Sequence, residues 1–286
     1  MFIEKLTPLI LTYNEAPNIG RALKRLDWAR DIVVVDSLSH DDTLKIVADF
    51  PQARVFQRKF DTHVNQWSFG MQETGIATDW VLALDADYLL TPELVEELKG
   101  LDPGQDVCGY RARFIYCVNG KPLKGSAYPP VTVLYRRDSA RYIQDGHTQR
   151  VEIRGEVSDL SSPILHDDRK SLSHWVWSQS RYTKLEAEKI KRTGFRELNL
   201  VDRIRKARLF APFLMLLYCL FVKGVILDGR AGIYYALQRT FAELMLSLYL
   251  FEHDLSIKDA RHEAGKSCDE VLGLKSASRP NVIGDS

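Results

Sequence analysis

The chain is poor in cysteine and has almost no net charge. Its 286 residues include four cysteines, and no two of them form a CxxC pair. This excludes a cysteine-rich zinc module and a disulfide scaffold, and it favours a reducing compartment. Lys and Arg number 39 against 38 Asp and Glu, which gives a formal charge of +1. So small a net charge argues against a generally basic protein that binds nucleic acid.

The N-terminus lacks the pattern of a secretory signal peptide. Glu4 and Lys5 precede a short apolar run that leads at once into a polar turn. We therefore expect the protein in the cytoplasm or on the cytoplasmic side of a membrane. Hydrophobic residues make up 45% of the chain, which excludes global disorder.

Strand-like and helix-like segments alternate over the first hundred residues. This alternation predicts an α/β fold in which right-handed crossovers build a parallel sheet. Ligands of such sheets bind at the carboxyl ends of the strands. The expected strands are 6–12, 31–36, 53–57 and 80–84, and the expected helices are 17–26, 43–50, 63–74 and 92–99.

The character of the sequence changes near residue 106. Segments 107–118 and 131–137 are typical of antiparallel strands around a turn at 119–122. A long helix follows over 171–192, with Ser171 as its cap. Two apolar helices are expected at 209–222 and at about 231–251, before a polar tail that we expect to be frayed.

Polar residues stand at the ends of three of the expected strands. They should face one crevice, because the strands are parallel. Asp85 and Asp87 could share one hard divalent cation, although an Asp-rich turn with no ligand is equally common after a strand. Asp36 could accept hydrogen bonds from a ribose or a base, or it could cap the next helix. The three groups are Thr12-Tyr13-Asn14-Glu15, Asp36-Ser37 and Asp85-Ala86-Asp87.

These motifs, in this order, resemble the nucleotide-sugar half of the family 2 glycosyltransferases, which have the GT-A fold. The matching stretches are 11–15 (LTYNE), 33–43 (VVVDSLSHDDT) and 83–87 (ALDAD), with Trp67-Ser68-Phe69-Gly70 on the helix between them. Within the family, the chain most resembles the branch that includes the lipopolysaccharide core β-glucosyltransferases. The resemblance implies a mixed sheet with a C-terminal helical appendage.

The resemblance also implies roles for these residues. Asp36, with Ser37, would hold the base or the ribose, and Asp85 would contact ribose or metal. Asp87 would ligate Mg²⁺ or Mn²⁺ on the diphosphate of a nucleoside diphosphate sugar, with UDP-hexose the simplest donor. The remaining donor-binding residues would be Thr12, Tyr13, Asn14, Glu15 and Ala86.

Family 2 enzymes invert the anomeric centre, and a carboxylate deprotonates the acceptor hydroxyl. In this branch a His-Glu pair would be expected, but Thr148 stands where the Glu would be. Asp145 is the nearest carboxylate and the candidate base, although an Asp-Gly turn is an equal alternative. His147 could orient the acceptor or a phosphate, or be structural.

A second polar cluster follows the apolar residues 164–165. His166 could be an additional ligand of the metal or the diphosphate, and Arg169 could neutralise the leaving diphosphate together with Lys170. The alternatives are a helix-entry cap at Asp167 or Asp168 and a solvated basic pair.

The C-terminal third combines positive charge with apolar residues. Residues 181–230 carry 12 Lys and Arg but 5 Asp and Glu. Segment 209–222 would be about 21 Å long as a helix, against roughly 30 Å of hydrocarbon in a bilayer. We favour a helix lying in an anionic membrane surface, with a buried core helix as the alternative. The preceding basic residues are Arg203, Arg205, Lys206 and Arg208.

The resulting division is a GT-A catalytic domain over 1–195, a membrane-associating helical region over 196–255 and a polar tail over 256–286. Within the catalytic domain, 1–105 is the nucleotide-sugar half and 106–170 the acceptor half. The expected activity is metal-dependent transfer of a sugar to a lipid-linked or lipopolysaccharide-type acceptor. Polyprenyl phosphate, an anion that needs no base, is an alternative acceptor. A nucleotide-sugar sensor or membrane adaptor without activity is a further alternative.

Overall fold

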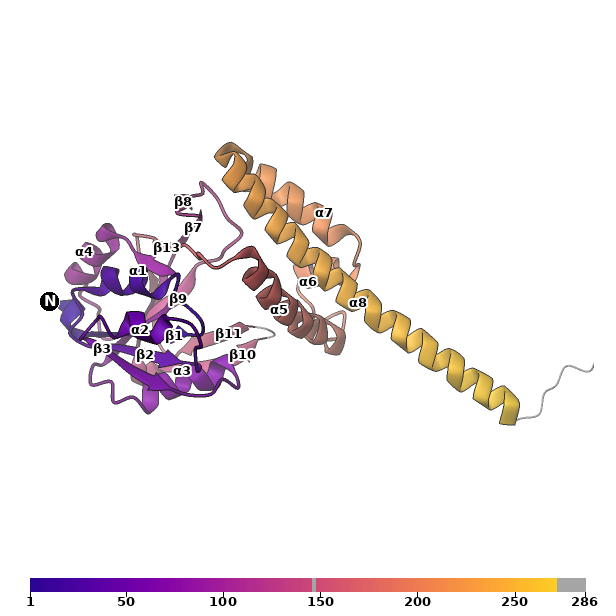
Figure 1. The fold of residues 1–286 in the computed structure, drawn as a ribbon, viewed down its shortest axis with the longest axis horizontal. Helices are drawn as coiled ribbons and strands as arrows, with labels where there is room; N and C mark the ends of the chain where they lie inside the picture. The colour runs from indigo at the N-terminus through magenta and orange to yellow at the C-terminus, as the bar shows by residue number, and fades with distance from the viewer. Residues whose placement is uncertain (146–147, 272–286) are drawn as a thin grey trace, which may run out of the picture.

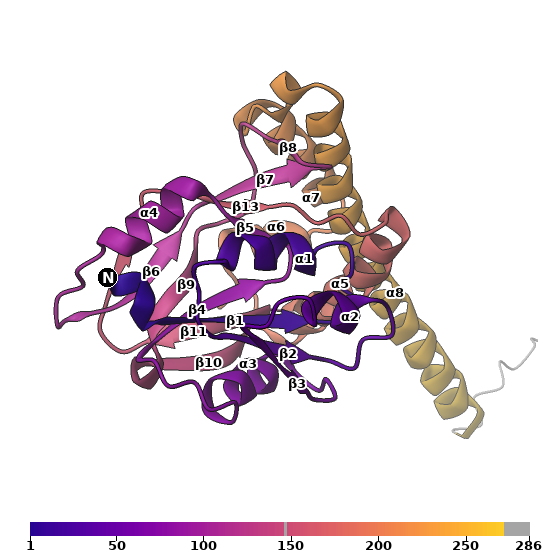
Figure 2. The same ribbon diagram turned by 60° about the vertical axis from the view of Figure 1, so that its left-hand side comes forward.

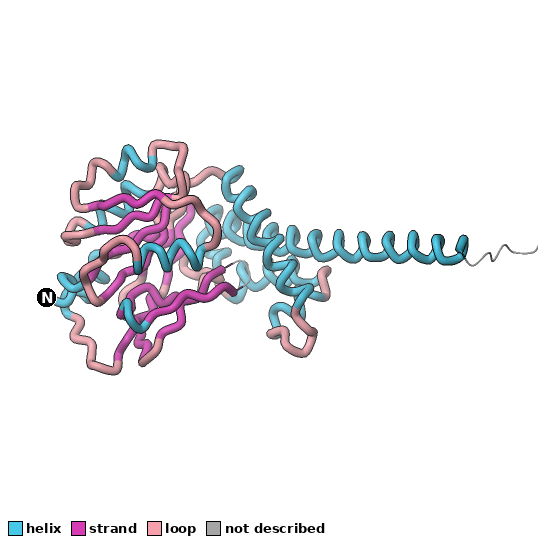
Figure 3. The backbone as a smooth tube through the Cα atoms, turned by 90° about the horizontal axis from the view of Figure 1, so that it is seen from below, coloured by secondary structure: helices cyan, strands magenta, loops and turns pink. Residues whose placement is uncertain are grey.

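The computed structural model describes residues 1–145 and 148–271. A layered α/β body lies at one end of the molecule, and a group of helices leads away from it (Figure 1). The long helix α8 runs beyond the rest of the fold, as the view along the perpendicular direction also shows (Figure 3). The expectation of a mixed α/β sheet followed by C-terminal helices is confirmed.

The main sheet has seven strands in the order β12-β6-β9-β4-β1-β2-β3. β1 pairs in parallel with both β2 and β4, and β2 pairs in parallel with β3. The chain therefore moves outward from β1 to β3 and then crosses to the other side of β1, which makes the β1–β4 junction a topological switch point. The four strands are Leu6–Thr12 (β1), Ile32–Asp36 (β2), Ala53–Gln57 (β3) and Trp80–Asp85 (β4).

Buried β-branched and aliphatic runs explain these strands. β2 is buried at all five positions, as expected for a strand covered on both faces. Figure 2 shows helices above and below the strands. Gly70 lets α3 approach β1 closely, since a Cβ there would lie 2.7 Å from a methyl group of Leu9. The covering helices are Ile19–Leu23 (α1), Thr43–Val47 (α2), His63–Gln72 (α3) and Pro92–Gly100 (α4).

The antiparallel region differs from the sequence expectation. Segment 107–118 is not one strand, because Arg113 separates β6 in the main sheet from β7 in a smaller one. β6 pairs with β9, whereas β7 forms the hairpin at Asn119-Gly120 with β8. The strands are Tyr88–Leu90 (β5), Val107–Ala112 (β6), Phe114–Val118 (β7), Lys121–Pro122 (β8), Val131–Arg136 (β9), Ala140–Asp145 (β10), Thr148–Ile153 (β11), Glu156–Asp159 (β12) and Ile164–His166 (β13).

The helical appendage is built from α5 to α8. Ser171 accepts a hydrogen bond from the His174 amide and caps α5 as expected. α8 extends twenty residues beyond the expected end at 251, so the expectation of a frayed tail from 256 is wrong as far as Val271. The helices are Leu172–Arg192 (α5), Leu200–Lys206 (α6), Phe210–Leu217 (α7) with a π turn at Tyr218–Val222, and Arg230–Val271 (α8); short 3-10 turns lie at Phe2–Lys5, Lys24–Leu26, Arg137–Ser139 and Val225–Asp228.

None of the helices in the described part of the chain is long and apolar enough to cross a membrane. Ala187 and Ile190 of α5 pack instead against Leu246 and Leu250 of α8. Because of this packing, we propose that α5 belongs with the helical region and that the catalytic domain ends near residue 171.

A buried charge network holds the appendage together. The guanidinium of Arg205 lies 2.6 Å from the carboxylate of Glu243 and 3.2 Å from that of Asp202. Both carboxylates are almost fully buried. Arg205 therefore faces protein carboxylates, and the expectation that it would face lipid head groups is wrong.

Replacing Arg205 should destabilise the protein. Arg205→Ala would leave two buried carboxylates without their cation, which costs about 3–5 kcal/mol. We expect urea denaturation to show a loss of that size. Arg203→Ala is the matched control, since Arg203 lies over the exposed ring of Phe195 and makes no ion pair in the described residues. Equal losses in the two variants would contradict this assignment.

Candidate functional site

The loops that follow β1 and β2 are joined by hydrogen bonds. The Asn14 amide donates to Ser39 Oγ (2.8 Å), and the His40 amide donates to Asn14 Oδ1 (2.8 Å). The Glu15 amide donates to Thr43 Oγ1 (2.7 Å). Asn14 adopts a left-handed conformation with φ of 52°, which Asn tolerates better than most residues. The two loops thus form one rigid rim at the carboxyl edge of the sheet.

Asp36 anchors this rim from below. It is fully buried, and its carboxylate accepts from Thr12 Oγ1 (2.9 Å), the Ser39 amide (2.9 Å) and Ser39 Oγ (2.5 Å). Ser37 is buried beside it and accepts from Gln66 Nε2 (2.9 Å). Asp36 therefore organises both loops, and the predicted contact of Asp36 and Ser37 with a nucleotide stays a proposal.

Asp85-Ala86-Asp87, the DxD turn, lies at the switch point. Asp85 pairs in register with Leu11 of β1, and Ala86 is buried between the two acids. Asp87 Oδ2 lies 3.1 Å from His166 Nε2, while Asp87 Oδ1 is buried without a hydrogen-bond partner. Burial and the charge of Asp87 raise the pKa of Asp85 to about 6. Although burial opposes it, the charge of His166 holds the pKa of Asp87 below its usual value.

Three tyrosines surround His166. Its ring centroid lies 5.3 Å from that of Tyr88 and 4.8 Å from those of Tyr116 and Tyr128. The Tyr88 and Tyr128 hydroxyls are 2.5 Å apart. This cage excludes water from one side of the Asp87–His166 pair and fixes the direction in which the imidazole points.

The DxD turn has ligand chemistry suited to a hard divalent cation. Asp87 Oδ1 is an unpaired carboxylate oxygen, the donor that Mg²⁺ and Mn²⁺ prefer. No three His, Cys, Asp or Glu side chains converge as a metal cluster within residues 1–145 and 148–271. Oxygens from outside the protein, such as those of a diphosphate, would have to complete the coordination. The set Asp85, Asp87 and His166 therefore stays a proposal.

The segment after β13 is tied to the segment after β1 by ion pairs. Asp167 is buried and accepts from Arg21 Nη1 (2.6 Å), Arg169 Nε (2.9 Å) and the Gly120 amide (2.9 Å). Arg169, predicted as a diphosphate ligand, thus faces a protein carboxylate. Lys170 lies 2.5 Å from Glu15 Oε1. Although burial opposes it, the charge of Glu15 raises the pKa of Lys170, which keeps the ammonium charged.

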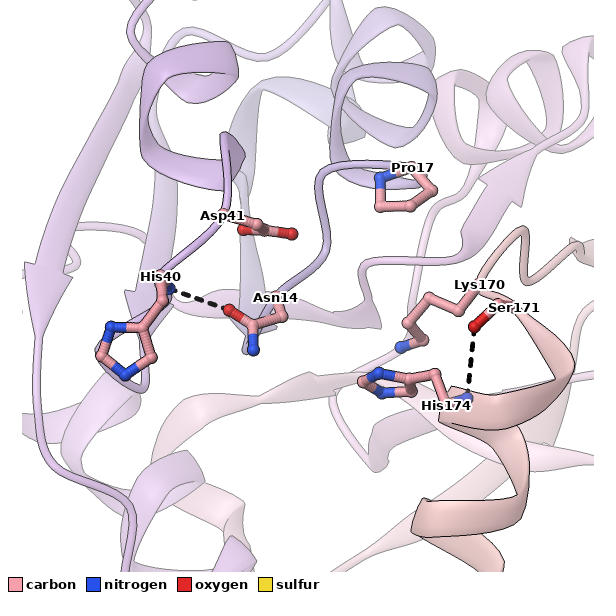
Figure 4. Close-up of a pocket in the computed structure, with 7 residues that line it drawn as sticks. All are labelled: Asn14, Pro17, His40, Asp41, Lys170, Ser171 and His174. Atoms are coloured by element: carbon pink, nitrogen blue, oxygen red, sulfur yellow. Dashed lines mark hydrogen bonds between the residues drawn. The ribbon is translucent and has the colours of Figure 1, made fainter.

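A cavity of about 460 Å³ lies between the two segments. Figure 4 shows the side chains of the β1 and β2 loops on one side and the start of α5 on the other. Of the predicted residues, Asn14 lines the cavity and Glu15 lies next to it through its ion pair with Lys170. Tyr13 is 38% exposed and does not line the cavity. The lining residues are Asn14, Pro17, His40, Asp41, Lys170, Ser171 and His174.

Sequence reasoning missed His40 and His174 as lining residues. The only available signal for His174 was its place in the first turn of α5, directly after Lys170 and Ser171. Of the two predicted acceptor-side residues, Asp145 ends β10, but its side chain lies outside what the structure describes. His147 lies outside the described residues altogether.

The fold is GT-A-like and has a nucleotide-sugar site. The features that define it are the switch point at β1–β4, the acid at the end of β2 and the DxD turn after β4. Residues 9–150, about half of the chain, match the profile of glycosyl transferase family 2, and the chain belongs to that family. It is therefore an enzyme that transfers a sugar from a nucleotide sugar.

Relatives cover most of the chain at low identity. An uncharacterized glycosyltransferase of Rickettsia felis is 27% identical over 207 residues, which are 67% of this chain and 72% of the relative. The lipopolysaccharide core biosynthesis glycosyltransferase LpsC of Rhizobium meliloti is 25% identical over 242 residues, 79% of this chain and 84% of LpsC. The crystal structure of S. aureus TarS residues 1–349 with UDP-GlcNAc has a TM-score of 0.48 at 13% identity, covering 88% of this chain and 92% of that one.

Removing the charge of Lys170 should weaken UDP binding more than removing that of Arg169. Lys170→Gln removes a cation that lines the cavity, and we expect UDP with Mn²⁺ to bind about tenfold more weakly, or about 1.4 kcal/mol. Arg169→Gln removes a cation that pairs with Asp167 and does not line the cavity, so its effect should stay below threefold. Isothermal titration calorimetry measures both constants. A larger loss in Arg169→Gln than in Lys170→Gln would contradict this order.

Proposed function

We propose that the protein is an inverting, metal-dependent glycosyltransferase that moves a hexose from UDP-hexose to a membrane-associated glycan acceptor. The proposal rests on the geometry of Asp87. One of its carboxylate oxygens lies beside His166, and the other is buried without a hydrogen-bond partner. A protein that did not bind a cation there would leave that oxygen desolvated without compensation. The likeness to LpsC over 79% of the chain supports a lipopolysaccharide-type acceptor.

The donor would lie across the carboxyl edge of the sheet. The rim of Thr12, Asn14 and Ser37 would hold the nucleoside above Asp36, and Lys170 would neutralise part of the diphosphate. Mg²⁺ or Mn²⁺, held by Asp87 with Asp85 and His166, would stabilise negative charge on the leaving diphosphate.

Asp145 is the proposed base. It ends β10, and Tyr142 of the same strand contacts both Tyr135 (2.8 Å between hydroxyls) and the ring of Trp67. This packing fixes the hairpin at the edge of the catalytic domain. The base would take the acceptor proton as the acceptor oxygen bonds to the anomeric carbon and the bond from that carbon to the diphosphate breaks.

The appendage supports association with the inner face of the cytoplasmic membrane. Phe210, Phe213, Leu214 and Leu217 follow a helical spacing of i, i+3, i+4, i+7, and all are exposed. Phe221 and Leu227 continue this apolar surface beyond α7 at 64% and 72% exposure. Cations without a carboxylate partner in the described residues lie in the segments before and after this surface, where anionic lipid could meet them: Arg203 and Lys206 of α6, Lys223 after the π turn and Arg230 at the start of α8.

A thermal-shift panel of nucleoside diphosphate sugars tests the donor site. With Mn²⁺ at saturation, we expect one donor to stabilise the wild type by about 2.7 kcal/mol at a hundred times its Kd. Asp87→Asn should abolish the shift, while Asp138→Asn, at a carboxylate that is 97% exposed, should keep it. A flat panel for the wild type would overturn the proposed donor.

Turnover of Asp145→Asn tests the base. Loss of a general base lowers kcat by about 10²–10⁴-fold, and donor binding should not change. The measurement is release of UDP with a membrane extract as the source of acceptor. Unchanged turnover in Asp145→Asn, with no turnover in Asp87→Asn, would contradict Asp145 as the base and favour polyprenyl phosphate as the acceptor.

Flotation with lipid vesicles tests the membrane surface. We expect the wild type to float with vesicles of one part phosphatidylglycerol to three parts phosphatidylethanolamine. Phe213→Asp with Leu217→Asp should reduce the bound fraction at least fivefold, because each change places a charge in the apolar layer. Leu185→Asp, on an exposed Leu of α5, is the control. A different outcome would assign the surface to a second copy of the chain. In that case the wild type does not float, light scattering shows that it is a dimer, and the double variant is a monomer.

A further inference from the structure

Arg239 of α8 carries a charge that no described residue balances. Its Nε is buried and has no hydrogen-bond partner. Leaving a buried donor unpaired destabilises the folded state, and more so when the group is charged. Arg208 also has an unpaired Nε, but its Nη2 lies 2.6 Å from Asp254, so its charge is balanced.

Arg239 lies on the face of α8 that packs against the catalytic domain. It is one helical turn after Tyr235, which is 2% exposed. The ring of Tyr235 contacts that of Tyr116 in β7 (4.8 Å), and its hydroxyl accepts from the Ala127 amide (2.8 Å). The Tyr235 face is therefore an interface, and Arg239 lies on α8 between Tyr235 and Phe241, whose ring is 6.3 Å from that of Trp175 in α5.

Tyr116 connects this interface to the DxD turn. Its ring contacts His166 at 4.8 Å, and His166 in turn lies beside Asp87. Burial raises the pKa of the Tyr116 hydroxyl; among the charges that act on it, Arg239 lowers the pKa and Asp87 raises it. Arg239 and Asp87 therefore both act on the Tyr116 hydroxyl by their charge.

We propose that Arg239 binds a phosphate group next to the DxD turn. Guanidinium presents paired donors that match phosphate oxygens, and a phosphate would supply the acceptors that Arg239 lacks. The inference rests on the proposed function, which places phosphates in this region. Two sources share the chemistry: the diphosphate of the donor, and a phosphate carried by a lipid acceptor.

The test measures binding of two probes to the full chain: UDP with Mn²⁺, and dodecyl phosphate. We compare the wild type with Arg239→Gln, with Arg239→Lys and with Lys184→Gln, which removes an exposed cation from α5. We expect Arg239→Gln to lose at least tenfold in affinity for one probe, Arg239→Lys to recover part of that loss, and Lys184→Gln to match the wild type. Thermal unfolding of each variant checks that the helix remains folded.

The probe that loses affinity identifies the source of the phosphate. If the wild type binds UDP and Arg239→Gln binds both probes within twofold of it, the inference about Arg239 is overturned while the donor site stands. If the wild type binds neither probe, the proposed donor site fails, and Arg239 has no phosphate to bind.

Discussion

The structure depends on the balancing of negative charge where several carboxylates meet at one edge of the main sheet. Strand ends and loops bring together Glu15, Asp36, Asp85, Asp87 and Asp167, all of them partly or fully buried. Their mutual repulsion in a poorly solvated region would oppose folding unless each negative charge is balanced. Arg21 and Arg169 balance Asp167, Lys170 balances Glu15, and hydrogen-bond donors surround Asp36. In the DxD turn, Asp87 has His166 beside one carboxylate oxygen and no partner for the other. We therefore propose that a cation from solution balances this remaining charge.

The helical appendage also buries carboxylates, and a single arginine balances them. Arg205 joins carboxylates of α6 and α8, so the helices depend on each other through buried charge as well as apolar packing. Beyond that core, α7 leaves large apolar side chains in water. The buried network keeps the helices packed while the outer face of α7 stays exposed, which is compatible with the proposed membrane-associated acceptor. Asp228 ties this unit to the catalytic domain through the Lys124 amide (3.0 Å).

The parallel half of the fold could be predicted from the sequence because its information is local. Buried strands such as β2 and β4 require runs of β-branched and aliphatic residues, and the caps Thr91 and Ser171 mark their helices. The tyrosine cage could not be predicted, because Tyr88, Tyr116 and Tyr128 come from separate segments whose meeting depends on tertiary packing. The expectation that Arg205 would face lipid head groups was wrong for a similar reason. The charge composition of the basic run is the same whether Arg205 faces lipid or buried carboxylates such as that of Glu243 in the distant helix α8. The length of α8 was missed because its distal half is polar and carries no apolar periodicity.

The proposed binding of a divalent cation and a nucleoside diphosphate at the DxD turn can be seen by anomalous diffraction from a crystal grown with UDP and Mn²⁺. We expect a manganese peak within coordination distance of a carboxylate oxygen of Asp87, close to the bound UDP, and no such peak in Asp87→Asn. A bound UDP with no manganese at Asp87, or a peak that persists in the variant, would contradict it.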